Sequence, residues 1–386
     1  MYASSPLYLC LVDDPVIYTV TGCDPFASVR LQILIAGTKT VNLIIYADAQ
    51  GEATVNISDI LIPLTPTLEC DNGVTGGTTF SLRYINDESI SGDMHIAIRG
   101  SVGIYNNLAG QNIYTLIINQ NANPFFTHRV EGDTLTFYRS ELKNMDLFFA
   151  KADDTTLSIL IGGALEDTAY YNSSSTIGAL SGAELAGTHR VIVNGRPKQI
   201  TYNFCLATLL DDNEEPLAQY NINIINDPKS DEMHLFRFIN TFGVWECMLI
   251  TGEAQNNPEA EDPEIFESET NYILQKSMQR REITERYSLS TGHLDTIRLR
   301  ILKELLRSEH VQMRINEDWY DCKVTASIDM SVVIRTPQSV QLDVELLLVS
   351  TGANAIRIEG SFEEQDFLLD HNDDIITNQN NNPVTT

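Results

Sequence analysis

The amino-acid sequence predicts a mainly β protein, made of several β-sandwich domains and a small C-terminal α+β domain that carries one clear helix. Apolar and polar residues alternate with a period of two, which places successive side chains on opposite faces of a strand. Glycine-bearing turns interrupt this alternation every ~8–12 residues, as in antiparallel sandwiches. The clearest helical spacing of apolar residues lies near residues 290–307.

Length and composition favour several packed domains. The chain has 386 residues, of which 43% are hydrophobic, and this length predicts two to three domains. We expect a β-sandwich domain over residues 1–118, a second one over 119–230, an α+β domain over 231–361 and a tail over 362–386. The tail is acidic and then rich in Asn and Thr, so it is expected to be disordered.

The first domain has the clearest strand pattern. Val29, Leu31, Ile33 and Ile35 alternate with other residues, and a turn at 36–39 leads into a second apolar run. Similar patterns predict strands over residues 29–35, 41–46, 52–57, 78–85, 94–99 and 113–118.

The second domain combines strand signals with a long interruption. The dipeptide Asn194-Gly195 predicts a hairpin turn, and the acidic run 211–215 predicts a solvated turn between two further strands. Small polar residues dominate from 162 to 182, which predicts a long connection. Strands are expected over residues 133–139, 147–151, 157–161, 189–193 and 198–204.

The third domain begins with two strands, 235–240 and 244–251, around a turn that holds Gly243. Residues 253–269 contain seven acids and no base, so we expect an exposed loop there. Further strands are expected over residues 312–315, 320–328, 332–335 and 340–349.

The predicted helix lies between these strands. Thr291 is its expected N-terminal cap, and Asp295 in the first turn suits the helix dipole. One apolar face is formed by Leu294, Ile297, Ile301 and Leu305.

The net charge excludes some partners. The chain has 25 Lys+Arg and 53 Asp+Glu, a formal charge of −28, which opposes binding to nucleic-acid phosphates and to anionic membranes. No segment reaches the ~18 apolar residues of a membrane-spanning helix, and the N-terminus has no signal-peptide pattern. The six cysteines are scattered without metal-ligand spacing, which predicts buried reduced thiols and no metal or cofactor.

Bases concentrate around the predicted helix: residues 276–314 hold nine bases and five acids. This basic segment is interpreted as a subunit interface in a ring, where it meets an acidic surface of the next copy. It is alternatively a solvated helix face with partners in 253–269. Nucleic-acid binding is a third reading, which the surrounding acidic charge disfavours. The candidate interface residues are Arg280, Arg281, Arg298, Arg300, Lys303 and Arg307.

No catalytic motif is found. The sequence has no GxSxG, HExxH, phosphate-loop or EF-hand pattern. Paired carboxylates of a polysaccharide hydrolase would have to face one cleft, and sequence alone cannot identify such a pair. Exposed aromatic residues could instead stack on sugars. The candidate glycan contacts are Tyr170, Tyr171, Trp319 and Tyr320.

The third domain holds several turn motifs in a fixed order. In Phe238–Glu246 a strand ends in an Asn-x-x-Gly turn, and the next strand closes in Thr251-Gly252. Residues 287–294 read Tyr-x-x-x-Thr-Gly-x-Leu. In these motifs the chain resembles tail proteins of phages and prophages of gut Bacteroidetes, and residues 55–61 resemble the end of the opening β-domain of that family. The resemblance covers residues 16–62 and 235–350.

This resemblance implies a virion protein of the phage tail, baseplate or connector that assembles as a homo-oligomeric ring and is not an enzyme. Its implied partners are copies of itself and other tail or virion proteins. Without a signal peptide, it would be made in the host cytoplasm and reach the virion by assembly. A glycan-binding β-sandwich for receptor recognition is the first alternative, and a polysaccharide hydrolase is the second.

Overall fold

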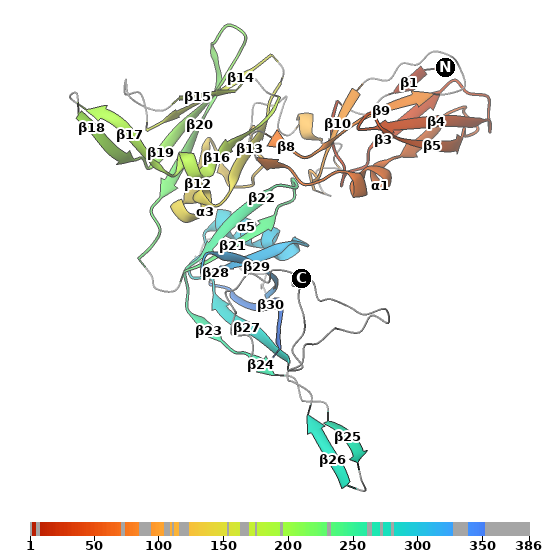
Figure 1. Cartoon of the computed structure of the whole chain (residues 1–386). Coiled ribbons are helices and arrows are strands. Elements are labelled where there is room, and N and C mark those ends of the chain that lie inside the picture. Colours follow the sequence, from red (N-terminus) through yellow and green to blue (C-terminus); the bar gives the residue numbers. More distant parts are fainter. Residues whose placement is uncertain are drawn as a thin grey trace, which may run out of the picture. The chain divides into compact units, whose positions relative to one another are not determined.

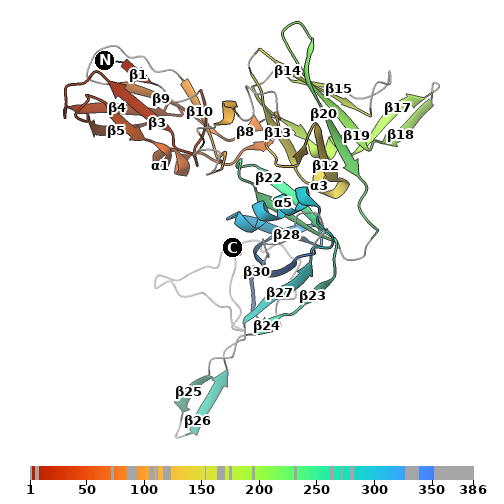
Figure 2. The same ribbon diagram turned by 180° about the vertical axis from the view of Figure 1, so that it is seen from behind.

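The computed structural model describes the larger part of the chain. The described residues are 2–4, 8–70, 74–84, 94–103, 109, 112–115, 123–152, 154–162, 170–173, 176–193, 196–229, 233–260, 265–270, 273–278, 282–326 and 339–351. Strands predominate and helices are few, which confirms the mainly β class (Figures 1 and 2). The chain forms two compact units, the first comprising Met1–Asn257 with Arg286–Leu347, and the second Pro258–Glu285 with Leu348–Thr386.

Two sheets share one core at the N-terminus. The five-stranded sheet runs in the order β2 (Leu9–Leu11), β10 (Met94–Ile98), β9 (Thr78–Tyr84), β4 (Ser28–Ile35), β5 (Lys39–Tyr46). The three-stranded sheet runs β1 (Tyr2–Ser4), β3 (Ile17–Thr21), β6 (Ala53–Asn56). Leu31 and Ile33 of β4 are buried in the same cluster as Tyr18 and Val20 of β3, so the predicted alternation does mark the inward face.

Short elements connect this part of the chain to the next. Helix α1 (Ser58–Leu61) continues into the 3₁₀ turn η1 (Ile62–Leu64), and β7 (Glu69–Cys70) pairs with β8 (Val74–Thr75). The strand expected over 113–118 is wrong in its described part. Asn112 Oδ1 instead accepts hydrogen bonds from the N–H groups of Tyr114 and Thr115, which closes a turn.

The next part of the chain contains a six-stranded sheet. Its order is β11 (Val130–Glu131), β12 (Thr134–Tyr138), β20 (Pro216–Ile225), β19 (Phe204–Leu210), β14 (Thr156–Ile161), β15 (Tyr170–Ser173). Strands β12 and β20 are parallel, which the long connection between them, beginning with α3 (Arg139–Lys143), makes possible, and the other pairs are antiparallel.

Two smaller ribbons accompany that sheet. Strand β13 (Asp146–Ala150) pairs with β16 (Ile177–Ser181), which leads into α4 (Gly182–Leu185). Strand β17 (Thr188–Val193) pairs with β18 (Arg196–Thr201), as the Asn-Gly signature predicted. The long connection expected from 162 to 182 is wrong where it is described, since β15 and β16 lie there.

The predicted helix packs against the third large sheet. The order of this sheet is β22 (Trp245–Ile250), β21 (His234–Ile239), β28 (Val311–Ile315), β29 (Asp318–Ala326), β30 (Gln341–Thr351), β27 (Glu282–Ser290), β23 (Ala254–Asn256). Helix α5 (Thr296–Arg307) buries Ile301 and Leu305 in one cluster with Phe236 and Phe238 of β21. The predicted apolar face is therefore the packed face.

Two expectations for this region are corrected. The cap of α5 is Asp295, whose Oδ1 accepts from the N–H of Arg298 at 2.7 Å, and Thr291 instead accepts from the N–H of Val340 at 2.9 Å. The expected loop 253–269 includes β23 and, in the second unit, β24 (Glu259–Ala260) and β25 (Ile265–Thr270). In that unit β25 forms a hairpin with β26 (Ile273–Met278), and β24 pairs with the start of β27.

Each large sheet draws its strands from one predicted segment, whereas the two compact units follow another division, so the domain boundaries stay a prediction. The expected strand 332–335 and the tail 362–386 lie outside the described residues.

Every helix in the described part of the chain is too short or too polar to cross a membrane. The prediction of buried thiols is confirmed for Cys10, Cys23, Cys205, Cys247 and Cys322.

Candidate functional site

The turn that carries the family resemblance lies at a junction between segments far apart in the sequence. Asn240, between β21 and β22, is buried and organises the turn: its Oδ1 accepts from the N–H groups of Phe242 at 3.0 Å and Val244 at 3.3 Å. Its Nδ2 donates to the carbonyl of Phe126 at 2.9 Å and to Glu246 Oε2 at 2.8 Å. One amide thus shapes the turn and ties it to the chain before β11.

Two glycines allow the N-terminal part of the chain to pack directly on this turn. Gly243 has a φ of +75°, and a Cβ there would lie 2.3 Å from the carbonyl oxygen of Arg99. Gly100 has a φ of +121°, and a Cβ there would lie 2.3 Å from the carbonyl carbon of Phe242. Any side chain at either position would separate the two backbones.

A buried ion cluster continues from Asn240. The side chain of Arg129 is only 2% exposed, and those of Glu141 and Glu246 are fully buried. Arg129 Nη1 lies 2.7 Å from Glu141 Oε2, and its Nε lies 2.8 Å from Glu246 Oε1. Its Nη2 donates to the carbonyl of Cys247, and Thr127 Oγ1 donates to Glu246 Oε1 at 2.9 Å. Charges buried this deeply require such partners.

Glu141 accepts more hydrogen bonds than Glu246, the other carboxylate of this cluster. Besides Arg129, it accepts hydrogen bonds from Arg298 of α5 at 3.2 Å and from the N–H groups of Leu249 at 2.7 Å and Tyr138 at 2.9 Å. Burial alone would raise the pKa of Glu141, but Arg129, Arg298 and the two N–H groups together hold that pKa below its ordinary value. The carboxylate is thus held charged as a structural group.

The predicted interface residues on α5 divide into two sets. Arg298 faces inward: its Nη2 donates to the carbonyl of Leu249, and its guanidinium lies 4.5 Å from the ring centre of Tyr138. Arg300 and Arg307 are exposed and Lys303 is partly exposed. Arg298 is therefore engaged within the chain, and its partners lie outside the 253–269 segment that the solvated-face reading named. The interface candidates outside the described residues are Arg280 and Arg281.

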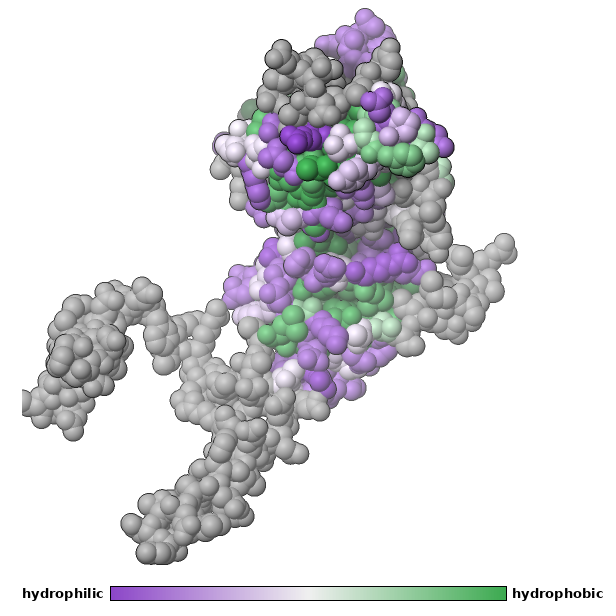
Figure 3. Space-filling model, turned by 90° about the vertical axis from the view of Figure 1, so that its right-hand side faces the viewer, coloured by the Kyte–Doolittle hydropathy of each residue, from purple (hydrophilic) through white to green (hydrophobic). Residues whose placement is uncertain are grey.

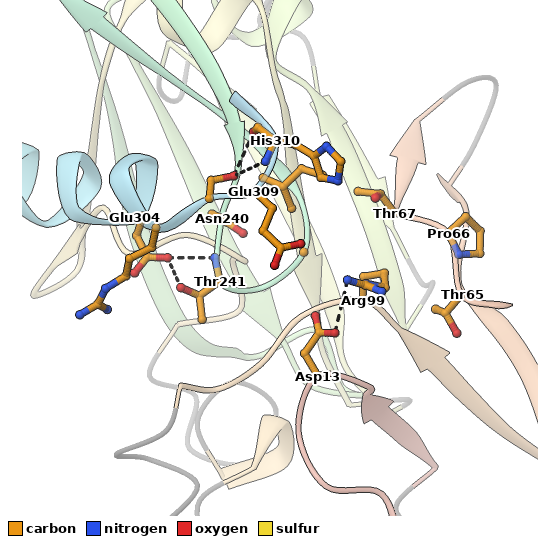
Figure 4. Close-up of a pocket in the computed structure, with 14 residues that line it drawn as sticks. Asp13, Thr65, Pro66, Thr67, Arg99, Asn240, Thr241, Glu304, Glu309 and His310 are labelled. Carbon is orange, nitrogen blue, oxygen red and sulfur yellow. Dashed lines mark hydrogen bonds and ion pairs between the residues drawn. The ribbon is translucent and has the colours of Figure 1, made fainter. Parts of the chain in front are cut away.

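A polar cavity of about 560 Å³ borders the same turn (Figure 4). Asp13 and Arg99 form an ion pair at 3.5 Å on one side, and Glu304 of α5 accepts from the N–H of Thr241 at 2.9 Å on the other. Both carboxylates thus have partners within the chain. Within the described residues, no cluster of three or more His, Cys, Asp or Glu side chains could hold a metal ion. The remaining lining residues include Glu309, His310, Arg307 and Thr67.

The aromatic glycan candidates are packing residues where they are described. Arg237 on β21 lies with its guanidinium 4.5 Å from the ring centre of Trp319 and 5.0 Å from that of Trp245. Tyr320 packs against the cluster beneath α5, and Trp319 against the cluster around the six-stranded sheet. Side chains of the other two candidates lie outside the described part: Tyr170 and Tyr171.

The sequence analysis missed the buried charges. Arg129 precedes a short strand without any periodic signal, and its partner Glu246 follows it by 117 positions. Only the resemblance pointed toward this place, because Glu246 closes the motif that begins at Phe238.

No protein-family model matches the chain, and a search of curated proteins finds no significant match.

Proposed function

We propose that this chain is a non-enzymatic virion structural protein of a phage tail, baseplate or connector, and that it assembles as a homo-oligomeric ring. The observation that carries the proposal is the role of the Phe238–Glu246 motif. The residues that resemble the tail-protein family form the junction between distant segments, through Asn240, Gly243 and Glu246. A motif whose residues hold distant β segments together suits a structural component that transmits force within an assembly.

The charged groups of the junction support the same proposal. Glu141, Glu246 and Glu304 each bond to groups within the chain, which suits a structural role. The candidate subunit contact is the outward face of α5, with Arg300, Lys303 and Arg307, together with Arg280 and Arg281 by sequence. A basic helix face on a chain of net charge −28 suits contact with an acidic surface of the next copy.

The test is assembly and its salt dependence. Purified protein is expected to form rings in negative-stain images, with a mass above the monomer by light scattering. Raising the salt should weaken these contacts, because salt screens exposed charges. Reversing the charges of Arg300, Lys303 and Arg307 to Glu should do the same at low salt. A monomer under all conditions, together with absence from virions by mass spectrometry, would contradict the proposal.

One observation favours glycan binding as a second candidate function. A cavity of about 330 Å³ is lined by Trp245, Arg237, Asp146 and Glu69. An indole beside carboxylate and guanidinium groups offers the stacking surface and hydrogen-bonding groups that sugars require. Binding on a glycan array that Trp245→Ala abolishes would favour this function, and an array without any binding would remove it.

A further inference from the structure

The β17–β18 hairpin stands out from the sheets around it. Among the described strands, β17 and β18 pair only with each other, in six residue pairs from Thr188↔Thr201 to Val193↔Arg196. Both ribbon views draw it apart from the neighbouring strands β19 and β20 (Figures 1 and 2). An isolated two-stranded hairpin is marginally stable in water, so it gains from a surface that covers it.

One face of the hairpin is exposed over its whole length. Ile192 is 56% exposed, and its cross-strand neighbour Pro197 is exposed as well. Elsewhere on the molecule hydrophobic residues also reach the surface among hydrophilic ones (Figure 3). The exposed face of the hairpin consists of Thr188, Arg190, Ile192, Pro197, Gln199 and Thr201.

The hairpin is also basic within an acidic protein. The 26 residues from 185 to 210 contain no Asp or Glu, although 53 of the 386 residues are acidic. They contain three cationic side chains, which are all exposed: Arg190, Arg196 and Lys198. The remainder of each copy therefore carries an even larger acidic surplus than the whole chain.

We propose that the β17–β18 hairpin is an arm that docks on an acidic surface of a second copy of this chain. This inference rests on the proposed homo-oligomer and names one of its contacts. Docking covers Ile192 and Arg190 on one face of the hairpin, while Arg196 and Lys198, which the register places on the opposite face but which are also exposed, meet further carboxylates of the acidic surface that receives the arm. A basic two-stranded ribbon can also enter a DNA groove, but the net charge of −28 repels the phosphate backbone.

The first experiment compares two charge-matched variants by light scattering and sedimentation at about 0.15 M salt, where the Debye length is about 8 Å. The arm variant carries Arg190→Glu, Arg196→Glu and Lys198→Glu. The control carries Arg30→Glu, Lys39→Glu and Lys229→Glu, three exposed positions outside the hairpin with the same charge change. The arm variant should weaken self-association at least tenfold relative to the control, with an unchanged circular dichroism spectrum.

The second experiment uses the wild-type protein, so it does not depend on a variant that folds. Copies with heavy and light isotopes are mixed, and a carbodiimide joins Lys198 to carboxylates in direct contact. We expect products that join Lys198 of one isotope to an Asp or Glu of the other. The digest also identifies the acidic surface that receives the arm.

The outcomes separate the two claims. If both variants assemble like the wild type and Lys198 gives no intermolecular product, the proposal that the hairpin is a docking arm is overturned. The proposed function is unaffected in that case, because the protein still assembles. A wild type that stays monomeric overturns both. Tight binding of duplex DNA that the arm variant abolishes and the control keeps would assign the hairpin to nucleic acid instead.

Discussion

Replacing Arg129 by Met tests whether the buried ion cluster stabilises the junction. Methionine fills a similar volume but removes the one cation that, among the described residues, contacts both Glu141 and Glu246, which are fully buried. Removing one partner of a buried ion pair typically costs about 3–5 kcal/mol. The loss in the free energy of unfolding has an upper limit, because a buried carboxylate that has lost Arg129 can bind a proton and become neutral instead. Protonating a carboxyl group with the ordinary pKa of 4.5 at pH 7 costs about 3.4 kcal/mol, at about 1.4 kcal/mol per pH unit.

Because the carboxylates can take up protons, the destabilisation should depend on pH, whereas a simple loss of packing would not. At pH 5 a stranded carboxylate takes up its proton at little cost, so the destabilisation by Arg129→Met should shrink by about 2–3 kcal/mol between pH 7 and pH 5. Glu246→Gln added to Arg129→Met should recover part of the loss at pH 7, because one of the two carboxylates is then neutral.

Urea unfolding followed by tryptophan fluorescence measures these effects. The chain has two tryptophans, Trp245 beside Glu246 and Trp319 on β29, so the signal reports on the sheet that holds the cluster. Arg30→Met, on the exposed face of β4, is the matched control and should change stability by less than about 0.5 kcal/mol. A loss below about 1 kcal/mol for Arg129→Met, or a loss equal at pH 5 and pH 7, would refute the reasoning.

Three other properties follow from the structure. Gly243→Ala should lower the urea midpoint by the equivalent of about 1–3 kcal/mol, because the new Cβ meets the Arg99 carbonyl and the φ is positive; Gly37→Ala, at a positive φ with open space around it, should cost less and is its control. The pKa of Glu141 is lowered on folding, so its stabilisation is present above 4.5 and is lost as pH falls through its folded value; Glu141→Gln should flatten the acid limb of a midpoint-against-pH curve. Burial raises the pKa of Cys205 to about 12, so this thiol should react with a thiol reagent only after unfolding, and stability should fall as pH rises above 9.0 toward 12.

The elements that sequence predicted well are those whose signal is local. In β4 the alternating residues face the core because a strand side chain's direction depends only on its position in the strand. In α5 the stripe that includes Ile301 and Leu305 faces the sheet for the equivalent helical reason. The Asn-Gly hairpin and the turn in which Asp211 Oδ1 accepts from the N–H groups of Asn213 and Glu215 are local as well.

The errors have non-local causes. Thr291 is a good cap by type, but its hydroxyl bonds to Val340, 49 positions away, and the chain enters the helix four residues later. The acidic composition of 253–269 predicts solvent contact, yet it does not prevent strand pairing in β25 and β26. The sequence pattern places Arg298 on an outer surface, because helical spacing does not reveal a distant buried carboxylate, here Glu141. Such contacts depend on the completed fold.

The ion cluster also constrains the order of events during synthesis. Arg129 leaves the ribosome 117 residues before Glu246, its partner on β22. At about 5–20 residues per second, this interval lasts roughly 6–23 seconds. During that time Arg129 and Glu141 can pair, but the carbonyl of Cys247 and the N–H of Leu249 do not yet exist. The six-stranded sheet therefore completes its core only after the next segment emerges, and a ribosome that pauses before residue 246 holds a nascent chain in which Arg129 lacks two of its partners, Glu246 and the carbonyl of Cys247.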